Sequence, residues 1–180
     1  MKSLNVLFIF SFILCAGMKT LNAQNVAIPD TNFKAVLLGD TTINTNGDAE
    51  IQVTEAMAYT GRITCSGQNI GDLTGIEAFV NLTELNCFGN QLISLDLSQN
   101  DSLVFLYCQS NQLSSLDVKN GNNLNFTTFN ATNNPNLSCI QVDDSLYSTT
   151  NWTSIDPTSV FSANCSVVIT VNIPNANFKA

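Results

Sequence analysis

The stretch NTNGDAEIQVTE, residues 44–55, spaces its oxygen-bearing side chains in the manner of a calcium-binding loop. Such a loop binds the ion from positions 1, 3, 5, 7 and 12, which are held here by Asn44, Asn46, Asp48, Glu50 and Glu55. Two residues depart from the pattern, because Asn44 replaces the usual aspartate and Ala49 stands where a glycine makes the sharp turn. The sequence therefore predicts calcium as a candidate cofactor, and the alternative is a polar loop held by asparagine and aspartate turns.

No arrangement of residues in the chain favours catalysis. The sequence contains no histidine, which removes Ser–His and Cys–His nucleophile pairs and the commonest metal ligand. Within the repeats the acidic residues occur singly, which does not favour a glycosidase. No glycine-rich phosphate loop follows a predicted strand. We therefore expect no catalytic residues, and a binding or structural protein rather than an enzyme.

The charge balance argues against two classes of partner. The 180 residues include six Lys and Arg and fourteen Asp and Glu, which gives a formal net charge of −8. A nucleic-acid-binding protein needs a basic stripe, and adhesion to anionic lipid needs a basic cluster. We expect neither nucleic acid nor an anionic membrane surface as a partner.

The cysteines fall into groups by position. Cys65, Cys87 and Cys108 recur at one position of a repeat, where cysteine serves as a small apolar filler. The alternative, a zinc site, is disfavoured because CxxC pairs are absent and the three sulfur atoms lie in a row. Cys139 and Cys165 flank the region after the last repeat, and the sequence leaves open whether they form a disulfide.

The elements that position these groups come from a repeat in residues 82–123. Two units of twenty-one residues follow each other, LTELNCFGNQLISLDLSQNDS and LVFLYCQSNQLSSLDVKNGNN. Leucine, cysteine and asparagine recur in register, in an LxxLxCxxNxLxxLxL pattern that is typical of a leucine-rich repeat solenoid. Each coil can bury its apolar side only against the next coil. We therefore expect about four stacked coils with a parallel β-sheet on the concave face.

Two weaker coils extend this repeat in both directions. The upstream coil has Ile63 and Cys65 in register, and the downstream coil keeps Leu124, Asn133 and Leu137, with Phe129 at the cysteine position. In the central coils we expect the amides of Asn90 and Asn111 to satisfy backbone groups of the neighbouring coil. Terminal coils are usually degenerate, which explains the weaker match downstream.

Alternation along each strand sends leucine and cysteine inward and their neighbours outward to the concave face. Projection of the repeat places several aromatic residues on adjacent strands of this face. The predicted binding residues are Glu84, Asn86, Phe88, Phe105, Tyr107 and Phe126. Contiguous exposed aromatic residues often mark interaction sites. The alternative is that a cap or a neighbouring copy covers them.

The residues before the repeat divide into two segments. Residues 1–23 have a basic start, an apolar run over residues 6–16 and Ala23 before Gln24. This pattern predicts a signal peptide, and the run is too short for a membrane anchor. Residues 24–60 predict a helical N-terminal cap, with one helix between Asp30 and Gly39 and a second near Thr54.

The repeats occupy residues 61–139, and the residues after them also divide into two segments. Residues 140–165 predict an irregular C-terminal cap, and the alternating SVVITVNI that follows is typical of a strand. The last eight residues, IPNANFKA, repeat the IPDTNFKA of residues 28–35 at six of eight positions. We therefore expect residues 166–180 to hold a strand and the start of a second tandem unit.

A set of motifs resembles a known family. IPDTNFKA, NTNGDAEI, DLTGIEAFVNLTELNC, the two NQLxSLD repeats and NNPNLSCIQVDD are similar to those of secreted leucine-rich-repeat proteins that Gram-negative bacteria export by the type IX route. The chain resembles the internalins more distantly. The resemblance implies an EF-hand-like cap, export to the cell surface and a protein or glycan partner. We expect a recognition module without a transmembrane segment; the alternative is a structural spacer repeat in a tandem surface protein.

Overall fold

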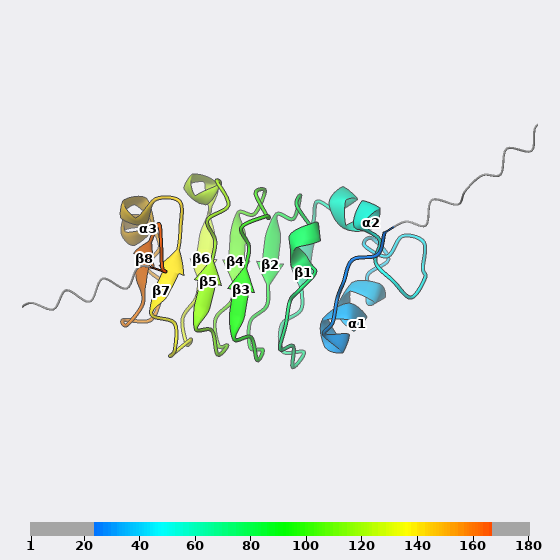
Figure 1. Ribbon diagram of the computed structural model, residues 1–180, viewed down its shortest axis with the longest axis horizontal. Helices are drawn as coiled ribbons and strands as arrows, with labels where there is room; N and C mark the ends of the chain where they lie inside the picture. Colours follow the sequence, from blue (N-terminus) through cyan, green and yellow to red (C-terminus); the bar gives the residue numbers. More distant parts are fainter. Residues whose placement is uncertain (1–23, 167–180) are drawn as a thin grey trace, which may run out of the picture.

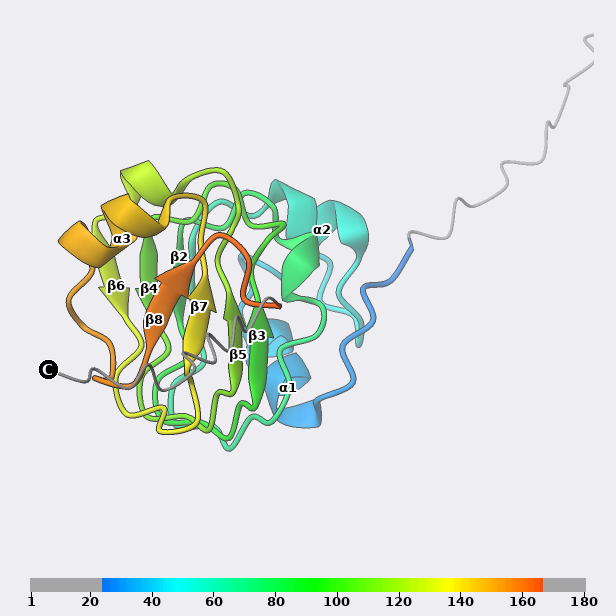
Figure 2. The same ribbon diagram turned by 60° about the vertical axis from the view of Figure 1, so that its left-hand side comes forward.

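The computed structural model describes residues 24–166. The predicted signal peptide and the predicted strand and second unit after residue 166 lie outside the described residues. Between them, parallel strands stack side by side along the long axis of the molecule (Figure 1). The helices α1 (Thr31–Gly39) and α2 (Val53–Ala58) lie at one end of this stack (Figures 1 and 2). The helix α3 (Ser145–Asn151) and the strand β8 (Val160–Ser162) lie at the other end. Among the described residues, no helix is long and apolar enough to cross a membrane.

The strands form two four-stranded sheets. The first sheet contains β1 (Arg62–Thr64), β2 (Glu84–Asn86), β4 (Phe105–Tyr107) and β6 (Thr128–Asn130). The second sheet contains β3 (Ser94–Asp96), β5 (Ser115–Asp117), β7 (Cys139–Gln141) and β8 (Val160–Ser162). Within these two sheets all strand pairings are parallel, and an isolated antiparallel bridge joins Asn25 to Gln52. The stacked parallel strands confirm the predicted leucine-rich-repeat-like solenoid, and the second sheet is an element that the sequence did not predict.

Five short helices accompany the strands within residues 24–166. They are α1 (Thr31–Gly39), α2 (Val53–Ala58), η1 (Ile76–Ala78), η2 (Asn123–Asn125) and α3 (Ser145–Asn151). The predicted N-cap of α1 is present, because the Asp30 carboxylate accepts hydrogen bonds from the backbone N–H groups of Asn32 and Phe33 at 2.9 and 3.0 Å. The structure thus has a helix that ends at Gly39 and a second one that begins at Val53, next to Thr54.

Asp30 also joins α1 to the first coil. Its second carboxylate oxygen accepts hydrogen bonds from the N–H groups of Gly71 and Asp72, at 2.8 and 3.3 Å. Burial disfavours the charged carboxylate, but the backbone donors outweigh this effect and lower the pKa of Asp30. Gly75 makes a second contact with the N-terminal segment, since a Cβ atom there would lie 2.8 Å from Cγ1 of Ile28. Its φ of 104° adds a backbone reason for glycine.

The core lies inside the coils and is built from the repeated apolar positions. Leu85 pairs with Leu106, and Leu95 with Leu116, and all four side chains are buried. Cys65, Cys87 and Cys108 are buried, unbridged cysteines at one inward position of successive coils. Their burial confirms the role predicted for them as apolar filler. Cys139 and Cys165, whose pairing the sequence left open, form a disulfide.

Buried asparagines connect the coils. The Asn111 amide donates to the carbonyl oxygens of Cys87 and Cys108 at 3.0 and 3.1 Å, and its own oxygen accepts from the N–H of Leu92. Asn90 donates to Cys65 and Cys87 in the same way. Because a buried backbone group without a partner is costly, these side chains satisfy groups that the turns would leave unpaired. The structural role predicted for Asn90 and Asn111 is confirmed.

The register predicted for the fourth coil is wrong. Phe105 pairs with Thr128, so the third coil has 23 residues instead of the 21 that separate Glu84 from Phe105, and the fourth coil begins two residues later than predicted. Phe129 therefore pairs with Leu106 and occupies a leucine position, whereas Ala131 follows in the cysteine position. Leu124, predicted to be a core leucine, is 67% exposed.

The asparagine of the fourth coil is also shifted. The connecting asparagine is Asn134, which is fully buried and donates to the carbonyl oxygens of Cys108 and Ala131. Asn133, which the sequence suggested, has a φ of 57° and takes the left-handed turn position that Ser110 holds one coil earlier, with a φ of 56°. Asparagine tolerates this backbone conformation better than most residues, so two adjacent asparagines have different roles.

Candidate functional site

Side chains on the outer side of the β1–β2–β4–β6 sheet form the strongest candidate site, called here the repeat face. Strand pairing arranges them in rows that cross the strands. The first row is Arg62, Glu84, Phe105 and Thr128, and the second is Thr64, Asn86, Tyr107 and Asn130. A third row, Ser66, Phe88, Gln109 and Thr132, follows the strands, where backbone hydrogen bonds keep the coils in register.

The repeat face brings together five of the six predicted binding residues. Glu84 and Asn86 lie on β2, Phe105 and Tyr107 lie opposite them on β4, and Phe88 follows β2. Phe88 is 44% exposed, and the other four are half-buried. Since neighbouring strands lie about 4.8 Å apart, three aromatic side chains share a small area of the surface.

Phe126, the sixth predicted residue, does not belong to this face. It is 7% exposed, and its ring packs against Phe129 and Trp152 with centroid separations of 6.4 and 5.1 Å. Because the third coil is two residues longer than predicted, Thr128 takes the outward position opposite Phe105 and Phe126 turns into the core. Thr128 therefore occupies the surface position at which the sequence had placed Phe126.

Sequence reasoning missed several members of the repeat face. Arg62 and Thr64 lie beside Glu84 and Asn86. The repeat pattern of the upstream coil, which is one residue longer than the next coil, could have identified them. Asn130 and Thr128 could be placed only once the length of the third coil was known. Gln109 follows Tyr107 in the repeat, so alternation along β4 was a signal for it.

One ion pair accounts for the charged side chains in these three rows. The Arg62 Nε atom lies 2.8 Å from a carboxylate oxygen of Glu84. The other ten positions carry aromatic, hydroxyl or amide side chains. The repeat face thus has no net charge, although the full sequence has a net charge of −8.

Of the residues predicted to bind calcium, Asn44, Asn46, Asp48 and Glu50 lie in the loop between α1 and α2, and Glu55 lies in α2. Hydrogen bonds connect several of them. The Asn46 amide donates to Asp48 at 3.0 Å and to Gln52 at 2.6 Å, and Gln52 donates to Asp48 at 3.0 Å. The Glu50 side chain points to Lys34, with an N–O separation of 2.8 Å. These contacts hold the loop closed by hydrogen bonds among its own polar side chains.

Two side chains, those of Asn44 and Glu55, bear on whether the loop suits a cation. The Oδ1 atom of Asn44 is buried and has no hydrogen-bond partner among residues 24–166, and a cation would satisfy such an oxygen. Glu55, however, accepts hydrogen bonds from Thr45, Asn46 and Gln52 through its two oxygens. Burial favours the neutral acid, but these donors outweigh it and lower the pKa of Glu55. The donor set fits calcium in type, provided that Glu55 exchanges some of these donors for the ion.

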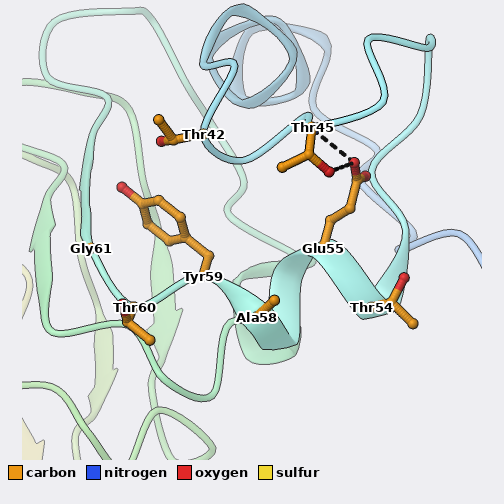
Figure 3. A pocket seen from close by; sticks show the side chains of 8 residues that line it. All are labelled: Thr42, Thr45, Thr54, Glu55, Ala58, Tyr59, Thr60 and Gly61. Carbon is orange, nitrogen blue, oxygen red and sulfur yellow. Dashed lines mark hydrogen bonds between the residues drawn. The ribbon is translucent and has the colours of Figure 1, made fainter.

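A shallow hollow of about 640 Å³ lies beside Glu55. Figure 3 shows Glu55 bonded to Thr45 on one side of it and the Tyr59 ring on the other. It is lined by Thr42, Thr45, Thr54, Glu55, Ala58, Tyr59, Thr60 and Gly61. The Tyr59 hydroxyl donates to the carbonyl oxygen of Arg62 at 2.6 Å, and the oxygens of Glu55 already accept from the loop. The Glu55 carboxylate and the Tyr59 hydroxyl are therefore already hydrogen-bonded within the fold. This makes the hollow a weaker candidate site than the repeat face.

Comparisons with known proteins support the fold. No protein-family model matches the chain, and no curated protein sequence matches it. The functional domain of InlJ from Listeria monocytogenes, described as including a cysteine ladder, superposes with a TM-score of 0.51 at 29% identity, over 79% of this chain and 28% of that chain. An internalin, inlF, from Listeria monocytogenes superposes with a TM-score of 0.51 at 19% identity, over 67% of this chain and 39% of that one.

These superpositions agree with the repeat architecture described above. Cys65, Cys87 and Cys108 form a row of buried cysteines in successive coils, and this row is called here the cysteine ladder. The chain spans about a quarter to two fifths of the length of these two neighbours. The comparisons and the parallel sheets together show an internalin-like leucine-rich-repeat fold.

Proposed function

We propose that this protein is a recognition module at the outer cell surface, which binds a protein or glycan partner through the repeat face. The observation that carries the proposal is the grouping of Phe88, Phe105 and Tyr107 on adjacent strands of one regular face. Exposed aromatic side chains that are held rigidly by a sheet supply large contact areas at a low entropic cost. Such anchors often dominate the binding energy of an interface.

Export to the surface supports this reading and is part of the proposal. The pattern of residues 1–23 predicts a signal peptide, and the Cys139–Cys165 disulfide suits an oxidising compartment outside the cytosol. The resemblance to type IX-exported proteins gives the route. An N-terminal cap of the EF-hand type, built from α1, α2 and the loop between them, belongs to the same proposal.

A spacer role is the second candidate. It is favoured by the near repeat of residues 28–35 at residues 173–180, which is typical of tandem arrays. In a spacer the coils would serve only to extend the array, and the repeat face would have no ligand of its own.

Binding assays on the purified chain without residues 1–23 separate the two roles. The chain is screened against a panel of surface proteins and a panel of glycans, beside a Phe105→Ala, Tyr107→Ala double variant. The matched control carries Ile93→Ala and Leu146→Ala, which remove two apolar side chains that are 61% and 78% exposed outside the repeat face.

A hit that the double variant loses and the control keeps supports recognition by the repeat face, provided that both variants melt cooperatively. A hit that both variants keep places the site elsewhere. A chain that binds nothing in either panel supports the spacer role.

A further inference from the structure

The middle row of the repeat face presents an aromatic ring between two amide groups. Tyr107 lies between Asn86 on one neighbouring strand and Asn130 on the other. All three side chains are half-buried, and they are spaced by about 4.8 Å from strand to strand. The phenol ring and the two amides are therefore close enough for one small ligand to touch all three.

Backbone hydrogen bonds orient both amides in the same way. The Asn86 Oδ1 atom accepts from the N–H of Phe88 at 3.2 Å, and the Asn130 Oδ1 atom accepts from the N–H of Thr132 at 3.1 Å. Each amide oxygen is thus held by the backbone N–H group two residues further along the chain. Among the hydrogen bonds within residues 24–166, none uses the NH₂ group of Asn86 or Asn130 or the Tyr107 hydroxyl. The donors are held in place and remain available to a partner.

The rest of the face has the same chemical character. Thr64, Thr128 and Gln109 border the middle row, and the amide oxygen of Gln109 has no hydrogen-bond partner among the described residues. The single arginine on the face is neutralised by Glu84 at 2.8 Å. An ionic partner would meet no opposing charge here, whereas the acidic remainder of the molecule would repel a polyanion.

We propose that the ligand of the repeat face is a neutral glycan, with one sugar ring stacked on Tyr107 and its hydroxyl groups bonded to the NH₂ groups of Asn86 and Asn130. This inference rests on the proposed function, because it names the ligand class of the same face. A sugar ring offers a face of C–H groups and a rim of hydroxyl groups. The C–H groups suit the electron-rich face of an aromatic ring, and a few placed amide donors suit the hydroxyl oxygens.

The lack of charge favours a glycan over a protein segment. Protein interfaces place charged and polar groups at their rims, and their partners show complementary charge. Apart from the Arg62–Glu84 pair, the three rows of the repeat face contain only aromatic, hydroxyl and amide groups. These groups match a ligand that is uncharged and hydroxylated along its whole length.

Affinity electrophoresis tests the inference with named probes. The chain without residues 1–23 is run in gels that contain dextran, galactomannan, mannan or a mixed-linkage β-glucan, and in gels that contain alginate or heparin. We expect retardation by at least one neutral polysaccharide and by neither polyanion. Raising the ionic strength should leave the retardation unchanged, because salt screens only charged interactions.

Nearly isosteric variants test the two amides. Asn86→Asp and Asn130→Asp keep the oxygen that accepts from the backbone but replace the NH₂ donor with a second oxygen. Each should weaken binding of the polysaccharide roughly tenfold, with little change in melting temperature. The control is Asn136→Asp, at an exposed asparagine outside the repeat face, which should bind as the unmodified chain does.

The possible outcomes separate this inference from the proposed function. If no neutral polysaccharide is retained, while a protein partner binds and is lost in the Phe105→Ala, Tyr107→Ala variant, the glycan inference is overturned and the recognition function stands. Retention by alginate or heparin that disappears with salt overturns the inference as well. If every ligand found binds equally well to that double variant, both proposals fall.

Discussion

At the scale of single residues, the buried asparagines show how one side chain can stabilise two coils. Asn111 contacts backbone groups of both its own coil and the preceding coil, through the carbonyls of Cys108 and Cys87. It is 6% exposed, so water cannot replace these hydrogen bonds. Loss of the amide would leave several buried backbone groups without partners, and each such group costs about 1–3 kcal/mol.

We therefore expect Asn111→Ala to lower the free energy of unfolding by about 3 kcal/mol. Urea denaturation followed by far-ultraviolet circular dichroism measures this change. Asn136→Ala is the matched control, because Asn136 is exposed and should cost well under 1 kcal/mol. A loss at Asn111 no larger than that at Asn136 would mean that the side chain contributes little to holding the coils together.

At the scale of elements, the segment between α1 and α2 combines a tight hydrogen-bond network with a sequence spaced for calcium. The capping box of α2, in which Glu55 accepts from the N–H of Gln52, uses the residue that stands at the last ligand position of the loop. The same carboxylate therefore serves the helix cap and, by prediction, the ion. Calcium binding remains a prediction that a direct measurement must decide.

The expected result is a higher melting temperature when calcium is added to chelated protein, since an ion that binds only the folded chain stabilises it. Glu55→Gln should abolish this rise. Glu50→Gln should preserve it, because position 7 supplies a backbone carbonyl and the Glu50 side chain instead faces Lys34. Differential scanning calorimetry of the three proteins gives the answer, and an unchanged melting temperature at millimolar calcium would leave the loop as a purely structural element.

At the scale of the whole molecule, the coils share one continuous core, so no single coil can open without exposing its neighbours. The cysteine ladder allows a test of whether the coils open together, because its three thiols are fully buried in successive coils. Burial raises the pKa of the Cys65 and Cys108 thiols to about 12 and raises that of Cys87 well above its usual value. Since the thiolate is the reactive form, the folded ladder should be inert.

A thiol reagent at mildly alkaline pH should therefore label none of these three cysteines in the folded chain without residues 1–23. All three should react after denaturation, while the disulfide of Cys139 and Cys165 remains closed without a reductant. Mass spectrometry of the labelled chain counts the modified residues. Labelling of Cys108 alone under native conditions would show that the C-terminal coils open independently of the rest.

The sequence by itself determined the central part of this protein. Between residues 82 and 123 the repeat is regular, so alternation along the strands placed Glu84 opposite Phe105 and Asn86 opposite Tyr107. The buried cysteines and the bridging roles of Asn90 and Asn111 followed from the same period. Repetition makes these features predictable, because each coil meets the same neighbours in the same register.

Only the tertiary structure decided what happens where the period breaks. The third coil holds two extra residues, so the register of the fourth coil is set by which side chains fill the core. Phe126 and Phe129 therefore turn inward against Trp152, and Thr128 and Asn130 reach the repeat face. The second sheet and the pairing of Cys139 with Cys165 likewise depend on contacts between distant residues. Local pattern cannot supply these contacts, because insertions in turns change the register without changing the pattern on either side.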